Sequence, residues 1–92
     1  MLVHLGQGVS VQSENILTLT DLQREQSLHL ETLVGQFRRR GLLRVMEGNP
    51  KTMVICRERA KTVCYLSSVG LRTLRRRMEE RQLIETREVQ HG

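Results

Sequence analysis

The spacing of apolar residues changes along this chain, and this change constrains the fold more than any other feature. Before Ser27, apolar and polar residues alternate in short runs, which is typical of half-buried β-strands. After Ser27 the apolar residues recur at helical spacing, at Leu30, Leu33, Val34 and Phe37. One small domain has to accommodate both patterns, so the sequence predicts an α+β fold.

Six short strands are predicted around this helix. They cover residues 1–5, 9–12, 16–20, 42–46, 52–56 and 62–65. Gly6-Gln7-Gly8 is a turn signal that joins the first two, and the last two form a hairpin whose tip, residues 57–61, is basic. We therefore expect a small, mostly antiparallel β-sheet, with the second half of the sheet antiparallel.

Two principal helices are predicted. Ser27 can cap the start of the first helix, and Gly41 can cap its end. The second helix is expected after the Ser67-Ser68 pair, with apolar residues on one side and arginines on the other: Leu71, Leu74 and Met78 against Arg72 and Arg76. Residues 1–78 are expected to form a single domain, and residues 79–92 a polar C-terminal extension.

Basic residues are concentrated in the middle of the chain. Residues 37–78 hold twelve basic and two acidic residues, whereas the segments on both sides carry more acidic than basic groups. Most of the cations are arginines, whose planar side chains bind phosphate with two hydrogen bonds. The alternative is an ordinary charged surface, in which Arg72 and Arg76 pair with Glu79 or Glu80 along the helix.

Six basic residues are the predicted DNA contacts, because they lie on loops or on the polar side of the second helix. They are Lys51, Arg57, Arg59, Lys61, Arg72 and Arg76. The run at residues 38–40 ends the first helix, where its charges can instead satisfy terminal carbonyls. The chain has one Phe, one Tyr and no Trp, so it lacks a set of aromatic side chains on which bases could stack. This lack favours duplex over single-stranded nucleic acid as the ligand.

The sequence lacks the motifs of enzymes and metal sites. It has neither paired His or Cys ligands at metal-binding spacing nor a nucleophile or phosphate-loop motif. We expect no enzymatic activity, no cofactor, no metal and no small-molecule substrate. No apolar run is long enough to span a membrane, and Cys56 and Cys64 are expected to be buried, reduced thiols, as in a cytoplasmic protein.

Three groups of residues together match the pattern of a known family: Met1-Leu2-Val3-His4-Leu5-Gly6, Gly48-Asn49-Pro50-Lys51-Thr52-Met53-Val54-Ile55, and Tyr65 with Ser67-Ser68, Thr73-Leu74 and Arg77. They resemble the bacterial extracellular-matrix regulator family of RemA and RemB, and the RemB branch more closely. This resemblance implies a small α+β subunit that assembles into a homo-oligomeric ring. It also implies binding of double-stranded DNA near promoters to activate biofilm-matrix genes.

The chain departs from the RemA-type pattern at three positions. Asn15, Asn49 and Pro50 stand where RemA-type members carry arginines, so the charge that contacts DNA has to come from neighbouring elements. Two alternatives to a DNA-binding regulator stay open. One is a ring-forming regulator that binds proteins and has no affinity for DNA, and the other is an RNA-binding module.

Overall fold

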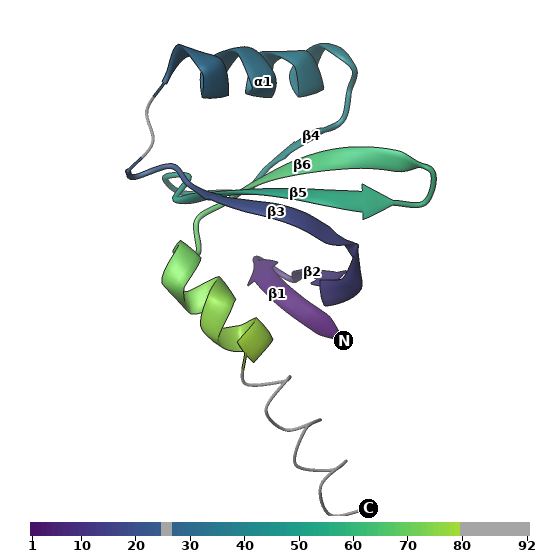
Figure 1. Ribbon diagram of the computed structural model, residues 1–92, viewed down its shortest axis with the longest axis vertical. Coiled ribbons are helices and arrows are strands. Elements are labelled where there is room, and N and C mark those ends of the chain that lie inside the picture. The colour runs from purple at the N-terminus through teal and green to yellow at the C-terminus, as the bar shows by residue number, and fades with distance from the viewer. Residues whose placement is uncertain (25–26, 80–92) are drawn as a thin grey trace, which may run out of the picture.

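A computed structural model describes residues 1–24 and 27–79 of the chain (Figure 1). In chain order the elements are β1 (Leu2–Gly6), β2 (Val9–Gln12), the short 3-10 helix η1 (Ser13–Asn15), β3 (Ile16–Asp21), α1 (Leu28–Arg39), β4 (Leu43–Val45), β5 (Thr52–Glu58) and β6 (Lys61–Ser67). A second α-helix covers residues 71–79 and is called the 71–79 helix below. Over the described residues this is an α+β fold with two α-helices and mostly antiparallel strands, as predicted.

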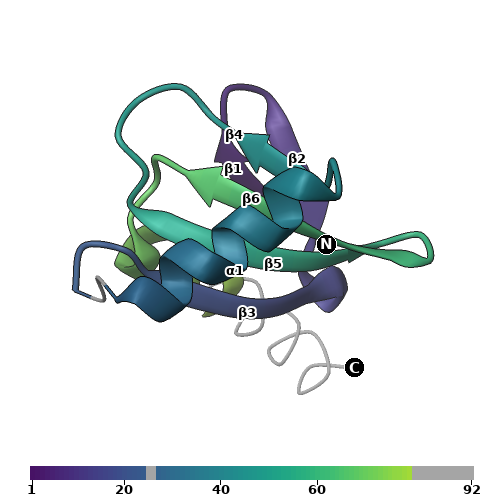
Figure 2. The same cartoon turned by 90° about the horizontal axis from the view of Figure 1, so that it is seen from above.

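The elements form three layers (Figures 1 and 2). A four-stranded sheet lies in the middle, α1 covers one of its faces, and the β1–β2 hairpin and the 71–79 helix cover the other. Side chains alternate between these faces along β5 because successive residues of a strand point to opposite sides. Met53 therefore packs beneath α1, whereas Val54 and Cys56 pack against the hairpin layer.

The strand order of the central sheet is β3-β5-β6-β4. The β3–β5 and β5–β6 pairs are antiparallel, but β4 lies parallel to β6, with Leu43 opposite Cys64. The expectation of an antiparallel second half was wrong at this pair. The reason is that α1 carries the chain back along the sheet, so β4 starts at the same end as β3 and runs in the same direction.

Both ends of α1 have the caps that the sequence predicted. The Ser27 hydroxyl oxygen accepts a hydrogen bond from the Leu30 amide (3.3 Å). At the other end Gly41 adopts a φ of 71°, the Leu42 amide donates to the Phe37 carbonyl (2.9 Å), and the Gly41 amide donates to the Arg38 carbonyl (3.1 Å). These two bonds are those of a Schellman motif, which uses glycine because L side chains disfavour positive φ.

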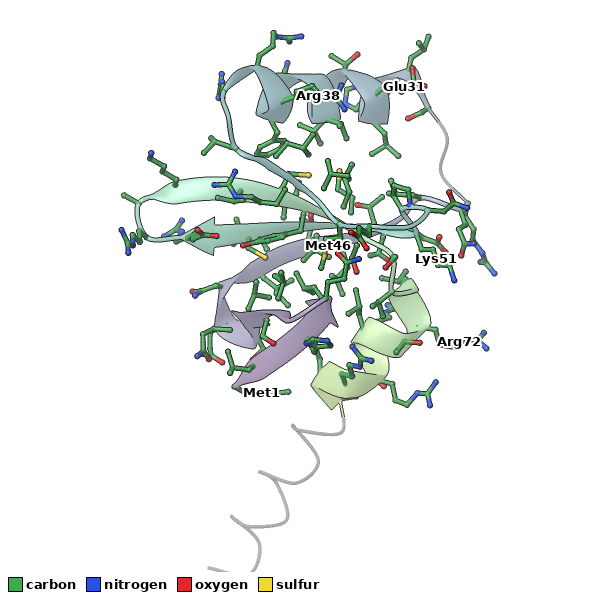
Figure 3. The ribbon with its side chains drawn as sticks, turned by 180° about the vertical axis from the view of Figure 1, so that it is seen from behind. Met1, Glu31, Arg38, Met46, Lys51 and Arg72 are labelled. Carbon is green, nitrogen blue, oxygen red and sulfur yellow. The ribbon has the colours of Figure 1, made fainter. Side chains whose placement is uncertain are left out.

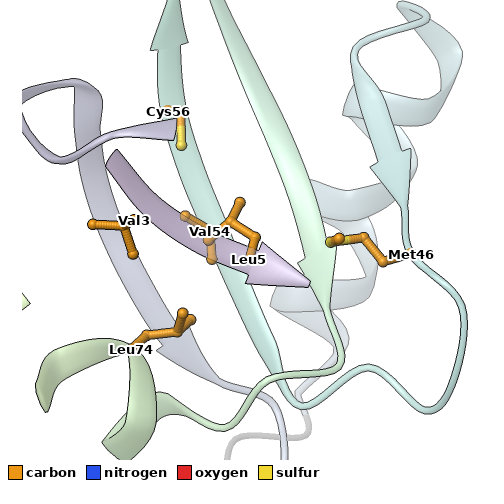
Figure 4. Packing of buried hydrophobic residues seen from close by; sticks show 6 residues of the cluster. All are labelled: Val3, Leu5, Met46, Val54, Cys56 and Leu74. Atoms are coloured by element: carbon orange, nitrogen blue, oxygen red, sulfur yellow. The ribbon is translucent and has the colours of Figure 1, made fainter. Parts of the chain in front are cut away.

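The larger core cluster lies between the central sheet and the layer of the hairpin and the 71–79 helix (Figure 4). Its buried members are Val3, Leu5, Met46, Val54, Cys56 and Leu74. The cluster joins the beginning of the described chain to the last helix, so the fold closes through contacts that are distant in sequence. Among residues 1–24 and 27–79, no helix has the length and apolar character needed to cross a membrane.

Polar contacts also attach the β1–β2 hairpin to the rest of the molecule. The buried Ser67 hydroxyl donates to the Leu5 carbonyl (2.7 Å) and accepts from the Val69 amide (3.0 Å). Arg77 of the 71–79 helix donates to the His4 carbonyl (2.6 Å). Arg77 therefore has a structural contact and is not one of the free cations of the helix.

Candidate nucleic-acid interface

The six predicted contact residues fall into two groups at opposite ends of the central sheet. Arg57, Arg59 and Lys61 lie at the β5–β6 turn, and this group is called the hairpin tip below. Lys51, Arg72 and Arg76 lie at the other end, where β5 begins; Figure 3 labels Lys51 and Arg72 on that side. The seven residues of β5 separate the groups by about 20 Å, at roughly 3.3 Å per residue.

The hairpin tip protrudes because β5 and β6 stay paired up to a two-residue turn. Glu58 pairs with Lys61, and Arg59 and Ala60 form the turn, with Arg59 at a φ of 58°. All of these side chains are exposed. The tip therefore presents three cations and one carboxylate on an exposed turn that a bulky ligand can approach.

The carboxylate of the tip is occupied by a neighbour. The Tyr65 hydroxyl donates to Glu58 Oε2 (2.8 Å). Burial, together with this hydrogen bond, raises the pKa of Tyr65 to about 12, so the phenol stays protonated and keeps donating at neutral pH. Glu58 is thus held back toward β6 while the basic side chains of the tip face solvent.

The end of α1 adds charge on the same side of the molecule as the hairpin tip. In both ribbon views α1 ends over the half of the sheet that leads to the β5–β6 turn (Figures 1 and 2). Arg38 and Arg39 occupy the last turn of α1, Arg40 is its C-cap, and all three are exposed. Their charge suits the carbonyl end of the helix, so they combine a structural role with a contribution to the basic surface.

Arg72 and Arg76 of the second group line a cavity that was not predicted. It lies between the end of β3 and the 71–79 helix and is called the arginine groove below. Its lining residues are Asp21, Arg24, Leu71, Arg72, Arg75, Arg76 and Glu79. Lys51 is not among them, although its carbonyl accepts a hydrogen bond from the Leu22 amide (2.9 Å) next to the groove.

Arg24 and Arg75 are the groove residues that the sequence-based prediction missed. Arg24 is the only basic residue in the acidic segment 1–36, and nothing local indicates that it meets the second helix. The strand register is what indicates this meeting. Asp21 pairs with Thr52, which places the end of β3 at the Lys51 end of β5. Asp21 then accepts from the Gln23 amide (2.9 Å) and lies 4.0 Å from the Arg24 guanidinium.

The helix-surface alternative, in which Arg72 and Arg76 pair with Glu79 or Glu80, is not seen for Glu79. Within residues 1–24 and 27–79, the pair of Arg24 and Asp21 is the only ion pair between two side chains. Glu80 lies outside the described residues. The arginines of the 71–79 helix thus have no carboxylate partner in the part of the chain that the structure describes.

The histidine, cysteine and acidic side chains are the other groups that could carry chemistry. In the described ranges no three His, Cys, Asp or Glu side chains gather as metal ligands would. Cys56 and Cys64 are buried and unbridged, and burial raises the pKa of each thiol to about 11. Neither is a thiolate at neutral pH, and the thiolate is the reactive form.

Comparison with models of protein families finds no match, and comparison with curated proteins finds no significantly similar sequence. Function is therefore inferred from the hairpin tip, the arginine groove and the strand order of the central sheet.

Proposed function

We propose that this protein is a cytoplasmic, DNA-binding transcriptional regulator of the extracellular-matrix regulator type, which contacts duplex phosphates through basic residues displayed on a homo-oligomer. The observation that carries this proposal is the hairpin tip. Its cations are exposed, they lie at a two-residue turn, and the nearby carboxylate of Glu58 accepts a hydrogen bond from Tyr65. Cations in this setting suit contacts with a phosphate backbone, which give affinity without sequence readout.

The edges of the central sheet support the oligomeric part of the proposal. β3 and β4 are the two edge strands, and each exposes a large apolar side chain: Leu17 is 50% exposed and Val45 is 62% exposed. Exposed apolar side chains on edge strands favour association, and contact between two different surfaces of a subunit generates a ring when the rotation closes. Several copies of the hairpin tip acting on one duplex would bind more tightly than one tip alone.

The second candidate is a ring-forming regulator that binds proteins and has no DNA affinity. The exposed Leu17 and Val45 favour this candidate equally, because apolar side chains on edge strands promote protein association whether or not DNA is bound. The two candidates differ in what the hairpin tip does, so a variant of the tip separates them.

The decisive experiment titrates labelled duplex DNA at several salt concentrations against wild-type protein and the triple variant R57A/R59A/K61A. We expect the wild type to bind with a steep negative salt dependence, and the variant to bind more weakly with a slope reduced by about three per engaged subunit, near 0.9 for each lost phosphate contact. The charge-preserving variant R57K/R59K is the control and should retain most of the slope.

Light scattering on each variant shows whether the oligomer survives. Unchanged affinity and slope in the triple variant, with the oligomer intact, would remove the hairpin tip from the interface. No duplex binding by the wild type even at low salt would favour the protein-binding candidate, and a preference for single-stranded RNA would favour an RNA-binding module.

A further inference from the structure

The arginine groove differs from the hairpin tip in the source of its cations. The cations of the tip belong to one β-turn, whereas the groove is an open cavity whose walls come from two elements, the end of β3 and the 71–79 helix. Leu71 adds an apolar side chain to a lining that also holds the guanidinium groups of Arg24, Arg72, Arg75 and Arg76. Concave sites that combine some apolar surface with a few converging polar groups are typical of small ligands.

Among the described residues, the charges of the groove do not cancel. Its lining there holds four guanidinium groups and two carboxylates, those of Asp21 and Glu79. Asp21 is already engaged, because it accepts from the Gln23 amide and lies beside Arg24. It therefore fixes the turn that carries Arg24 and does not neutralise the arginines of the helix.

Three of the four arginines are neighbours on one helix. Arg76 follows Arg72 by four residues and Arg75 follows it by three, spacings that bring side chains together on a helix surface and make like charges repel. The three span only about 6 Å along the helix axis, at 1.5 Å per residue. A compact anion with more than one negative charge would relieve this repulsion and accept paired hydrogen bonds from the guanidinium groups.

We propose that the arginine groove binds a compact phosphate-bearing ligand, such as the diphosphate portion of a nucleotide, at a site separate from the duplex-binding hairpin tip. Arg72 and Arg76 hold the phosphate from the helix, Arg24 approaches from the end of β3, and Leu71 contacts the less polar part of the ligand. The inference stands whether or not the tip binds DNA.

The test uses inorganic pyrophosphate as the probe, in calorimetric titrations of the full chain with ionic strength held constant by sodium chloride. We expect saturable binding to the wild type, and binding about tenfold weaker or more in R72A/R76A. The matched control R57A/R59A removes two arginines from the hairpin tip and should bind pyrophosphate like the wild type. Arg72 and Arg76 are exposed, and circular dichroism checks that the groove variant keeps its helices.

A second variant and a competition experiment sharpen the result. R72K/R76K keeps the charge but loses the planar fork, so we expect it to bind pyrophosphate with intermediate affinity. Pyrophosphate at saturation should not displace a labelled duplex beyond the effect of chloride at the same ionic strength.

Three outcomes would overturn the inference. The first is a wild-type titration no different from that with chloride, and the second is equal binding by R72A/R76A and the wild type. The third is loss of duplex and pyrophosphate binding together in R72A/R76A, with each ligand displacing the other, which would identify the bound phosphates as those of a DNA backbone.

Discussion

Arg59 combines an exposed charge with a backbone conformation that arginine disfavours. Its φ of 58° lies in the left-handed region, which costs L residues about 1 kcal/mol or more and costs glycine much less. We expect Arg59→Gly to raise the free energy of unfolding by about 0.5–1 kcal/mol in urea titrations. Both Arg59→Gly and Arg59→Ala should weaken duplex binding, because both remove the cation.

Arg59→Ala is the matched control for stability, since alanine loses the charge but keeps the unfavourable φ. Arg59→Ala should not raise the free energy of unfolding. An equal gain in both variants would mean that relief of charge repulsion at the tip, and not the backbone, is the cause.

Two buried thiols and one partly buried phenol make the stability of the fold sensitive to alkaline pH. Burial raises the pKa of Cys56 and Cys64 from 9.0 to about 11, and burial with the Glu58 hydrogen bond raises that of Tyr65 from 10.0 to about 12. A pKa that is higher in the folded state stabilises the fold fully below the unfolded value and ceases to do so as pH rises through the folded value. We expect the free energy of unfolding to fall between about pH 9 and pH 12.

Urea titrations across this range measure the loss, and Tyr65→Phe should diminish the part of it above about pH 10. Tyr65 is the only tyrosine, so the tyrosinate absorbance of the native protein reports it directly. Ionisation of Tyr65 near its ordinary pKa in the folded protein would contradict this prediction.

At the scale of elements, Ser67 connects β6 to β1. Its hydroxyl is fully buried and donates to the Leu5 carbonyl, so Ser67→Ala leaves that buried carbonyl without its partner. We expect a loss of about 1–3 kcal/mol in the free energy of unfolding, measured by urea titration. Ser68→Ala is the control, because Ser68 is only partly buried, and its loss should be well below that of Ser67→Ala. Similar losses in the two variants would exclude a special role for the Ser67 hydroxyl.

Elements with local signals were predictable, and contacts between distant elements were not. The caps at Ser27 and Gly41 are determined by residues within one helical turn, so the bounds of α1 could be predicted closely. The parallel pairing of β4 depends on where α1 returns the chain. The position of Arg24 depends on the pairing of Asp21 with Thr52, thirty-one positions later. The arginine groove could not be predicted for the same reason, because its walls meet only in the folded sheet.

At the scale of the whole molecule, the edge strands determine whether copies of the chain associate. We expect L17K and V45K each to shift the molecular mass measured by light scattering toward that of a monomer, because a lysine on an edge strand opposes pairing with another strand. Both side chains are exposed, so circular dichroism should be unchanged. Leu28→Lys is the control, since Leu28 is 81% exposed but lies at the start of α1. Wild-type mass in L17K and V45K would exclude association through the edges.

The attachment of the β1–β2 hairpin to Ser67 and Arg77 has a consequence during synthesis of the chain. A two-stranded hairpin is at best marginally stable alone, and the hydrogen bond that holds Leu5 comes from a residue 62 positions later. At roughly 5–20 residues per second, several seconds pass between translation of Leu5 and of Ser67. The apolar side of the hairpin, with Val3 and Leu5, lacks its core neighbour Leu74 for at least that interval. β1 and β2 therefore complete their native contacts only after β6 and the 71–79 helix have been synthesised, and until then they are open to chaperones.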